Sequence, residues 1–139
     1  MDGRDKMKVV NASGKRKRSI ARAMLTEGIG IVRINKIPID NYTPKISRMK
    51  IREPLILAGD LANKIDVEIS VNGGGFNSQV EAARVALANA MVEFSKGSKL
   101  KETFLAYDRN FLVSDVRYKE THKPNRHGKA RGKVQKSYR

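Results

Sequence analysis

The sequence predicts an α+β domain in which one β-sheet carries helices on one face, followed by a long, extended, basic C-terminal tail. Three observations predict this fold class. The segments follow the order of several strands, helix, strand and helix, which is typical of a single sheet with one helical layer. The 139 residues, 40% of them hydrophobic, suffice for one core. In the last part of the chain periodicity disappears and basic residues dominate.

Three consecutive strands are predicted in the first third of the chain. Runs rich in β-branched or alternating residues place them at Lys8–Ala12, Ser19–Leu25 and Ile29–Ile34. Ser13-Gly14 has the composition of a turn after the first strand. Gly28 and Gly30 lie where the second run gives way to the third, as a hairpin connection would.

The middle of the chain predicts an irregular segment, a helix and a further strand. Pro38 and Pro44 indicate irregular backbone before the helix. The helix is expected over Lys45–Gly59, where Pro54 either kinks it or starts a second turn of helix. Ile65–Val71 alternates between apolar and polar residues, which predicts a strand with one buried face.

Two helices are predicted after this strand. Ser78 and Glu81 have the spacing of a capping box at the start of the first helix. Its apolar residues form one stripe with helical spacing: Val80, Ala83, Leu87, Ala90, Met91 and Phe94. Lys96 and Gly97 are expected to end it, as a cation near the negative dipole end and a C-cap. A shorter helix is expected over Lys99–Leu105.

The formal charge of +15 is concentrated at the two ends of the chain. Residues 1–18 contain seven basic and two acidic residues, a net charge of +5, and residues 117–139 contain nine and one, a net charge of +8. Residues 19–116 contain thirteen and eleven, a net charge of only +2. Such ends repel themselves and are expected to bind a polyanion, most commonly nucleic acid. An anionic membrane is the alternative, but the tail lacks the apolar stripe of a surface-bound helix.

Composition argues against several other classes of protein. The chain has no cysteine, which excludes disulfides and thiolate zinc sites. No apolar run approaches the roughly 18 residues of a membrane span, and the N-terminus lacks the apolar stretch of a secretory signal. A soluble cytoplasmic protein is therefore expected. His122 and His127 have too few neighbouring ligands for a metal site and are expected to stack or hydrogen-bond on RNA. No set of residues predicts catalysis or a cofactor.

A basic cluster near the start of the chain is the first candidate nucleic-acid site. Lys15, Arg16, Lys17 and Arg18 precede a strand directly, and Arg22 extends the patch over one sheet face. Arginine grips phosphates bidentately and lysine acts as a point charge. The alternative interpretation is a solvated hairpin.

The tail is the second candidate. Lys129, Arg131 and Lys133 alternate with glycine and alanine, and such small residues let a backbone approach phosphates closely. An extended tail would reach roughly 75 Å, so it can act far from its domain. The alternative is a disordered tail that only increases solubility. The charge density favours RNA or DNA, and the crevices of a folded RNA suit an extended basic chain.

A glycine run between a strand and a helix is a weaker candidate. Gly73–Gly75 resembles a phosphate-cradling loop. However, Phe76 and Asn77 stand where a Walker loop needs Lys and Ser or Thr, and GxGxxG is absent. A tight turn is favoured, with contact to a nucleic-acid phosphate as the alternative.

Three segments together resemble a known family. They are "GKRKRSIARAML" near the start, "VNGGGFNSQVEAARVALANAM" in the middle and "DVRYKETHKPNRHGKARGKVQKSYR" at the end. The chain is similar to the universal small-subunit ribosomal protein nine family in its archaeal and eukaryotic type, over nearly its whole length from about residue 8. Asn89 departs from the family, which usually has Arg or Lys there, so one RNA contact of that helix is in doubt.

The resemblance implies a fold and a domain division. The fold is a mixed four-stranded sheet with helices on one face and an unusual left-handed βαβ crossover. Residues 1–7 would be an N-terminal extension without an assigned role, residues 8–116 the rRNA-binding domain, and residues 117–139 the extended tail.

The resemblance also implies a place and partners: the head of the small ribosomal subunit, small-subunit rRNA, peptidyl-site tRNA and neighbouring ribosomal proteins. In such a protein the tail runs through rRNA, and its last residues touch the anticodon stem-loop of the tRNA. Lys136 and Arg139 would face tRNA phosphates, assisted by Ser137 and Tyr138. The expected rRNA-binding residues of the tail are Arg117, Lys123, Arg126, Lys129, Arg131 and Lys133. The main alternative is a general nucleic-acid-binding module outside the ribosome. The enzyme alternative is a small-molecule kinase, because the fold that the resemblance implies is shared with some phosphate-transferring domains. Such a kinase would bind a nucleotide at Gly73–Ser78, but no metal-binding acid or basic residue accompanies that loop.

Overall fold

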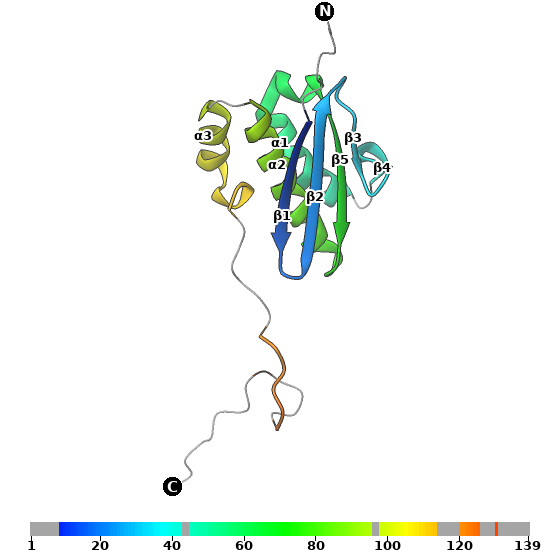
Figure 1. Cartoon of the computed structure of the whole chain (residues 1–139), viewed down its shortest axis with the longest axis vertical. Coiled ribbons are helices and arrows are strands. Elements are labelled where there is room, and N and C mark those ends of the chain that lie inside the picture. The colour runs from blue at the N-terminus through cyan, green and yellow to red at the C-terminus, as the bar shows by residue number, and fades with distance from the viewer. Residues whose placement is uncertain (1–8, 43–44, 96–97, 114–119, 126–129, 131–139) are drawn as a thin grey trace, which may run out of the picture.

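Five strands form one sheet, and the α-helices of the described residues lie on one side of it (Figure 1). This computed structural model describes residues 9–42, 45–95, 98–113, 120–125 and 130. The α+β class predicted from the sequence is confirmed. Most of the predicted tail and the whole of the N-terminal extension lie outside the described residues, so the predicted domain boundaries stay predictions.

The sheet is mixed, with the strand order β1-β2-β5-β3-β4. Its strands are β1 Val9–Arg16, β2 Ser19–Glu27, β3 Val32–Ile34, β4 Ile37–Pro38 and β5 Ile65–Asn72. β3 and β5 pair in parallel, and the other neighbours pair antiparallel. The last strand of the sequence therefore lies at the centre of the sheet.

The predicted turn at Ser13-Gly14 is wrong, because β1 continues through it to Arg16. Gly14 is buried against helix α2 (Phe76–Ser95), where a Cβ atom would overlap the carbonyl oxygen of Ala82. Gly14 thus allows the strand to approach the helix closely. The chain reverses instead after Arg16, at Lys17, whose φ is +53°.

The predicted hairpin at Gly28 and Gly30 is also wrong, because β5 lies between β2 and β3. The segment of residues 28–31, which connects β2 to β3, crosses the start of β5 and is held there by one carboxylate. Oδ1 of Asp66 accepts hydrogen bonds from the backbone N–H groups of Ile29, Gly30 and Ile31, at 3.0, 3.2 and 3.0 Å. These hydrogen bonds hold the pKa of Asp66 below its ordinary value, and the bond from Ile31 has the largest effect. The alternation of Ile65–Val71 predicted only that the polar residues of this strand, Asp66 among them, lie on the face that is not buried.

The expected four-stranded sheet gains a fifth strand, the two-residue β4. Asn35 and Lys36 both have positive φ, 50° and 69°, which matches the tight hairpin turn that suits the twist of paired strands. Pro38 then pairs with Arg33 at the edge of the sheet, where proline is tolerated. Two prolines within a few residues hid this short strand from a prediction based on local sequence.

The crossover from β3 to β5 is left-handed. It passes through helix α1 (Lys45–Ala58) behind the sheet (Figure 1). With the helices behind and these two parallel strands running downward, β5 lies to the left of β3 (Figure 1). The handedness implied by the family resemblance is therefore confirmed, against the strong general preference for right-handed connections.

The helical layer of the described residues contains three α-helices, α1, α2 and α3, the last spanning Ser98–Tyr107. α1 continues through Pro54, which is buried. α2 begins two residues before the predicted capping residue, so Ser78 lies inside the helix, buried, and the predicted capping box is wrong. The backbone N–H of Gln79 donates instead to the carbonyl of Gly75 at 3.0 Å, just ahead of the helix. Both helices predicted after β5 are confirmed, with these changes of boundary.

The core lies between the sheet and α2, which also packs against α1 and α3. The alternate residues of β5 predicted to be buried are buried, and so is the predicted stripe of α2 except Phe94, which is half-buried. Arg84 of α2 links the helical layer: its Nη1 lies 3.0 Å from Oε2 of Glu53 on α1. Its guanidinium carbon lies 4.8 Å from the ring centroid of Phe111, which is fully buried in the short 3₁₀ helix Arg109–Phe111.

Candidate nucleic-acid interface

The basic cluster near the start of the chain forms the tip of the β1–β2 hairpin. Lys15 and Arg16 end β1, and Lys17 and Arg18 make the turn to β2. All of them are exposed except Arg16, which is half-buried. The cluster therefore places its charge at one end of the sheet rather than along a helix.

Strand alternation divides this cluster between the two faces of the sheet. Arg16 points toward the helical layer, where its Nε lies 2.8 Å from Oε2 of Glu81 on α2. Lys15 follows the buried Gly14 and lies on the opposite, open face. The predicted phosphate contact of Arg16 would therefore compete with an ion pair inside the domain, whereas the neighbouring lysine faces solvent.

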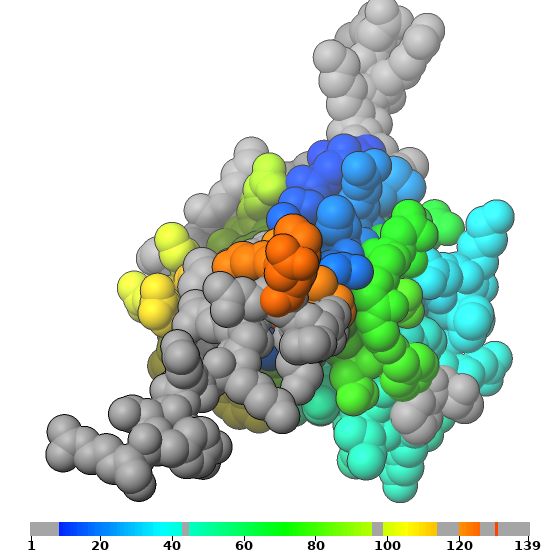
Figure 2. Space-filling model, turned by 90° about the horizontal axis from the view of Figure 1, so that it is seen from below, coloured from blue at the N-terminus to red at the C-terminus, as the bar shows by residue number. Residues whose placement is uncertain are grey.

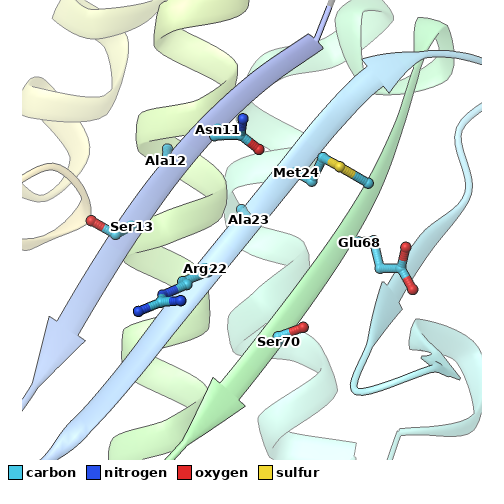
Figure 3. A pocket seen from close by; sticks show the side chains of 8 residues that line it. All are labelled: Asn11, Ala12, Ser13, Arg22, Ala23, Met24, Glu68 and Ser70. Atoms are coloured by element: carbon cyan, nitrogen blue, oxygen red, sulfur yellow. The ribbon is translucent and has the colours of Figure 1, made fainter.

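Arg22 lies in the middle of β2 on the open face. It is exposed, with Ser13 of β1 directly opposite on one side and Ser70 of β5 on the other. Figure 3 shows these three side chains around a shallow hollow, together with Met24 and Glu68. The expectation that Arg22 lies on a sheet face is confirmed, and its contact with phosphate stays a prediction.

The glycine run lies beside the tip of the hairpin. Oγ of Ser19 donates a hydrogen bond to the carbonyl of Gly73 at 2.8 Å. A Cβ on Gly73 would lie 2.7 Å from the carbonyl oxygen of Arg18, and both Gly73 and Gly74 have positive φ. Figure 2 shows the blue surface of the β1–β2 hairpin next to the green surface of β5 and the segment that follows it. The tight-turn interpretation thus has a structural cause, since these glycines let two loops pack together.

Only a small part of the predicted tail site is described. Nζ of Lys123 lies 2.7 Å from Oε1 of Glu120, and His122 is exposed. Asn89, the departure from the family pattern, is half-buried on α2. The other predicted tail residues lie outside the described residues: Arg117, Arg126, His127, Lys129, Arg131, Lys133, Lys136, Ser137, Tyr138 and Arg139.

Neither a metal centre nor a membrane span is found within the described ranges. No three residues among His, Cys, Asp and Glu come together there in a way that would hold a metal ion. No helix in that part of the chain has both the length and the apolar character to cross a bilayer.

Sequence reasoning missed two kinds of residue at this interface. Ser13 and Ser70 flank Arg22 only through strand pairing, and Ser13 had been assigned to a turn. Glu81 had been assigned to a capping box, although it pairs with Arg16. Charge complementarity was the only available signal for that pair, and it does not specify which of many cations is the partner.

Comparison with known proteins gives consistent matches over nearly the whole chain. Residues 14–139 match the family described as ribosomal protein S9/S16. The small ribosomal subunit protein uS9 of Methanococcus vannielii is 53% identical over 134 residues, which are 96% of this chain and 100% of that protein. The proteins of the same name from Methanococcus maripaludis strains C7 and C5 are each 54% identical over the same shares.

Proposed function

The chain belongs to the ribosomal protein S9/S16 family, and from this membership we infer that it is a structural constituent of the small ribosomal subunit. Its role is then structural, in translation, rather than catalytic. It acts where ribosomes act, in the cytoplasm. Its partners include small-subunit rRNA and other ribosomal proteins.

We propose that rRNA is bound by the tip of the β1–β2 hairpin and by the tail. The observation that carries this proposal is the gathering of Lys15, Lys17 and Arg18 at one exposed end of the sheet, next to the glycine loop. Charges held on a paired hairpin are already fixed relative to one another, so little ordering free energy opposes phosphate binding. Counterion release from the RNA adds to the affinity. Arg16 and Arg22 complete the proposed domain site, and Arg117, Lys123, Arg126, Lys129, Arg131 and Lys133 form the proposed tail site.

Removal of the charge at the tip of the hairpin tests this proposal. The triple variant Lys15→Gln, Lys17→Gln and Arg18→Gln is compared with the matched variant Lys64→Gln, Lys99→Gln and Lys101→Gln, which loses three exposed cations elsewhere. Each is added to small subunits that lack the native protein, and retention is measured by sedimentation after a moderate salt wash. We expect the hairpin variant to be washed off and the control to be retained. Equal retention would reject the hairpin as the rRNA site.

We also propose that the end of the tail contacts peptidyl-site tRNA through Lys136, Ser137, Tyr138 and Arg139. The support is the family membership and the match of the family pattern through residue 139. Truncation after residue 135 is expected to speed dissociation of tRNA from the peptidyl site while subunit assembly stays normal. An unchanged tRNA dissociation rate would reject this role.

A general nucleic-acid-binding module outside the ribosome remains the competing interpretation, and the same salt wash separates it from the proposal. A structural constituent resists washing of purified subunits because it is held by many phosphate contacts at once. A loosely bound protein is removed by moderate salt.

A further inference from the structure

We propose that the open face of the sheet holds one phosphate of small-subunit rRNA, with Arg22 as its principal ligand and the hydroxyls of Ser13 and Ser70 beside it. The proposal rests on the proposed function, because it takes rRNA as the partner. It goes further by assigning a specific phosphate site on the sheet, and by stating which part of the open face the RNA avoids.

The first support is the cross-strand row that contains Arg22. Ser13 on β1 and Ser70 on β5 are its direct partners in register, and all three are exposed. Adjacent strands lie about 4.8 Å apart. A phosphate bound by the guanidinium therefore has a serine on the neighbouring strand to each side of it (Figure 3). Guanidinium and hydroxyl donors together match the acceptor oxygens of a phosphodiester.

The second support is the difference between two arginines on the same face. Arg33 of β3 lies opposite Glu68, and its positive charge also helps to lower the pKa of Asp66. Arg22 has no hydrogen bond or ion pair with any part of the chain that the structure describes. An exposed arginine flanked by two hydroxyls rather than by acids is available to an external anion.

The third support is the division of charge along the open face. Lys15, Lys17 and Arg18 lie at the hairpin end, in continuity with Arg22, while the other half of the face carries two acidic side chains, Asp66 and Glu68, with Arg33 opposite Glu68. A polyanion is attracted to the first part and repelled by the second. We therefore expect the RNA strand to pass over the hairpin half of the sheet and to end its contact at Met24 and Glu68, which lie opposite each other on β2 and β5.

The apolar border of the hollow favours a nucleotide over a bare ion. Its floor is the backbone of β1 and β2 at Ala12 and Ala23, whose side chains point to the covered face, and Met24 borders it with 44% of its surface exposed (Figure 3). The soft thioether of a methionine packs well against a ring. The sugar or base next to the bound phosphate is thus expected to contact Met24.

A matched pair of variants tests the proposal in the full-length protein. Arg22→Gln and Arg33→Gln remove the same charge from exposed positions of the same sheet face. Affinity is measured by filter binding to a transcript of Methanococcus small-subunit rRNA at several salt concentrations. For Arg22→Gln we expect affinity about tenfold weaker, the loss of one charge-assisted contact. The slope of log affinity against log salt should shrink by about 0.8. Arg33→Gln should change neither quantity.

The outcomes separate this proposal from the one on which it rests. If the wild-type protein does not bind the transcript more tightly than a random RNA of equal length, the proposed function fails and the phosphate site fails with it. If the wild type binds but Arg22→Gln behaves like Arg33→Gln, rRNA binding stands and the sheet-face site is overturned. That second result is also expected if a neighbouring protein, rather than RNA, covers this face.

Directed cleavage gives a second readout that does not depend on affinity. The chain contains no cysteine, so Ser70→Cys and the control Ile56→Cys each provide one attachment point for a chelated iron that cleaves nearby RNA. Ile56 is an exposed position on α1, in the helical layer. We expect strand cleavage from position 70 at sites absent with position 56. Cleavage from position 56 alone would overturn the proposal.

Discussion

The two faces of the β1–β2 pair are built from neighbouring residues, but they have different roles. On the covered face, Gly14, Ala21 and Leu25 pack against the helices and expose almost no surface. On the open face, Ser13 and Arg22 alternate with them and stay in solvent. Because side chains alternate along a strand, a position next to a core residue is free to serve binding. Stability and RNA contact are therefore expected to respond to different substitutions only one residue apart.

The largest expected effect is on the covered face, at Gly14. In Gly14→Ala the new Cβ overlaps backbone atoms of α2, so strand and helix must separate. Overpacking of this kind costs about 3 kcal/mol of the free energy of unfolding, measured by urea denaturation followed by circular dichroism. Ser13→Ala, on the open face, is the matched control and should change stability by less than about 0.5 kcal/mol. Similar losses in both variants would contradict the division between the faces.

A smaller effect is expected when two arginines of opposite faces are compared. Arg16→Gln removes the ion pair with Glu81, whose side chains are 25% and 30% exposed, so solvent screens part of the interaction. We expect a loss of about 1 kcal/mol in unfolding free energy, at the upper end for surface pairs. Arg22→Gln should leave stability unchanged while it weakens RNA binding. The comparison breaks down if Arg22→Gln proves the more destabilising of the two.

The smallest effect is expected at Asp66, where the open face also has a structural task. Three backbone N–H groups favour the charged carboxylate in the folded protein, so its pKa is lowered there. The stabilisation is fully present above the unfolded-state pKa of about 3.9 and is lost as the pH falls through the lower folded-state pKa. Asp66→Asn should therefore unfold more easily than wild type at neutral pH, and the difference should vanish in strong acid.

The pH dependence needs its own control, because many carboxylates titrate in acid. Glu68→Gln removes a carboxylate from the same strand and face, one that makes no such backbone contacts within the described residues. Thermal unfolding at a series of pH values is measured for both variants. A difference between wild type and Asp66→Asn that stays constant down to strong acid would show that the carboxylate charge is not what holds the crossing segment.

Local periodicity predicted the elements of this fold better than their connections. The alternation of β5 and the stripe of α2 are properties of single segments, and both were confirmed. The turn at Ser13-Gly14 was predicted wrongly because glycine there serves a contact with α2, some seventy residues later in the chain. The position of β5 between β2 and β3 depends on pairing between distant segments, and so does the crossover, whose handedness came from the family resemblance alone.

The candidate interface shows the same limit of local reasoning. Alternation placed Arg22 on a sheet face, and that was confirmed. The division of Lys15 from Arg16 follows from the same rule, but it was missed because β1 was expected to end at Ala12. The serines beside Arg22 and the partner of Arg16 depend on register and packing, which only the three-dimensional structure provides.

The central position of β5 also bears on how the chain folds while it is being synthesised. The β1–β2 hairpin and the β3–β4 hairpin are complete by Pro38, yet no direct pairing joins them, and both wait for residues 65–72. Until then each hairpin presents an unpaired strand edge, the kind of edge that invites pairing with another chain. A nascent polypeptide of this protein thus passes through an interval of aggregation risk, and the arrival of one eight-residue strand closes it.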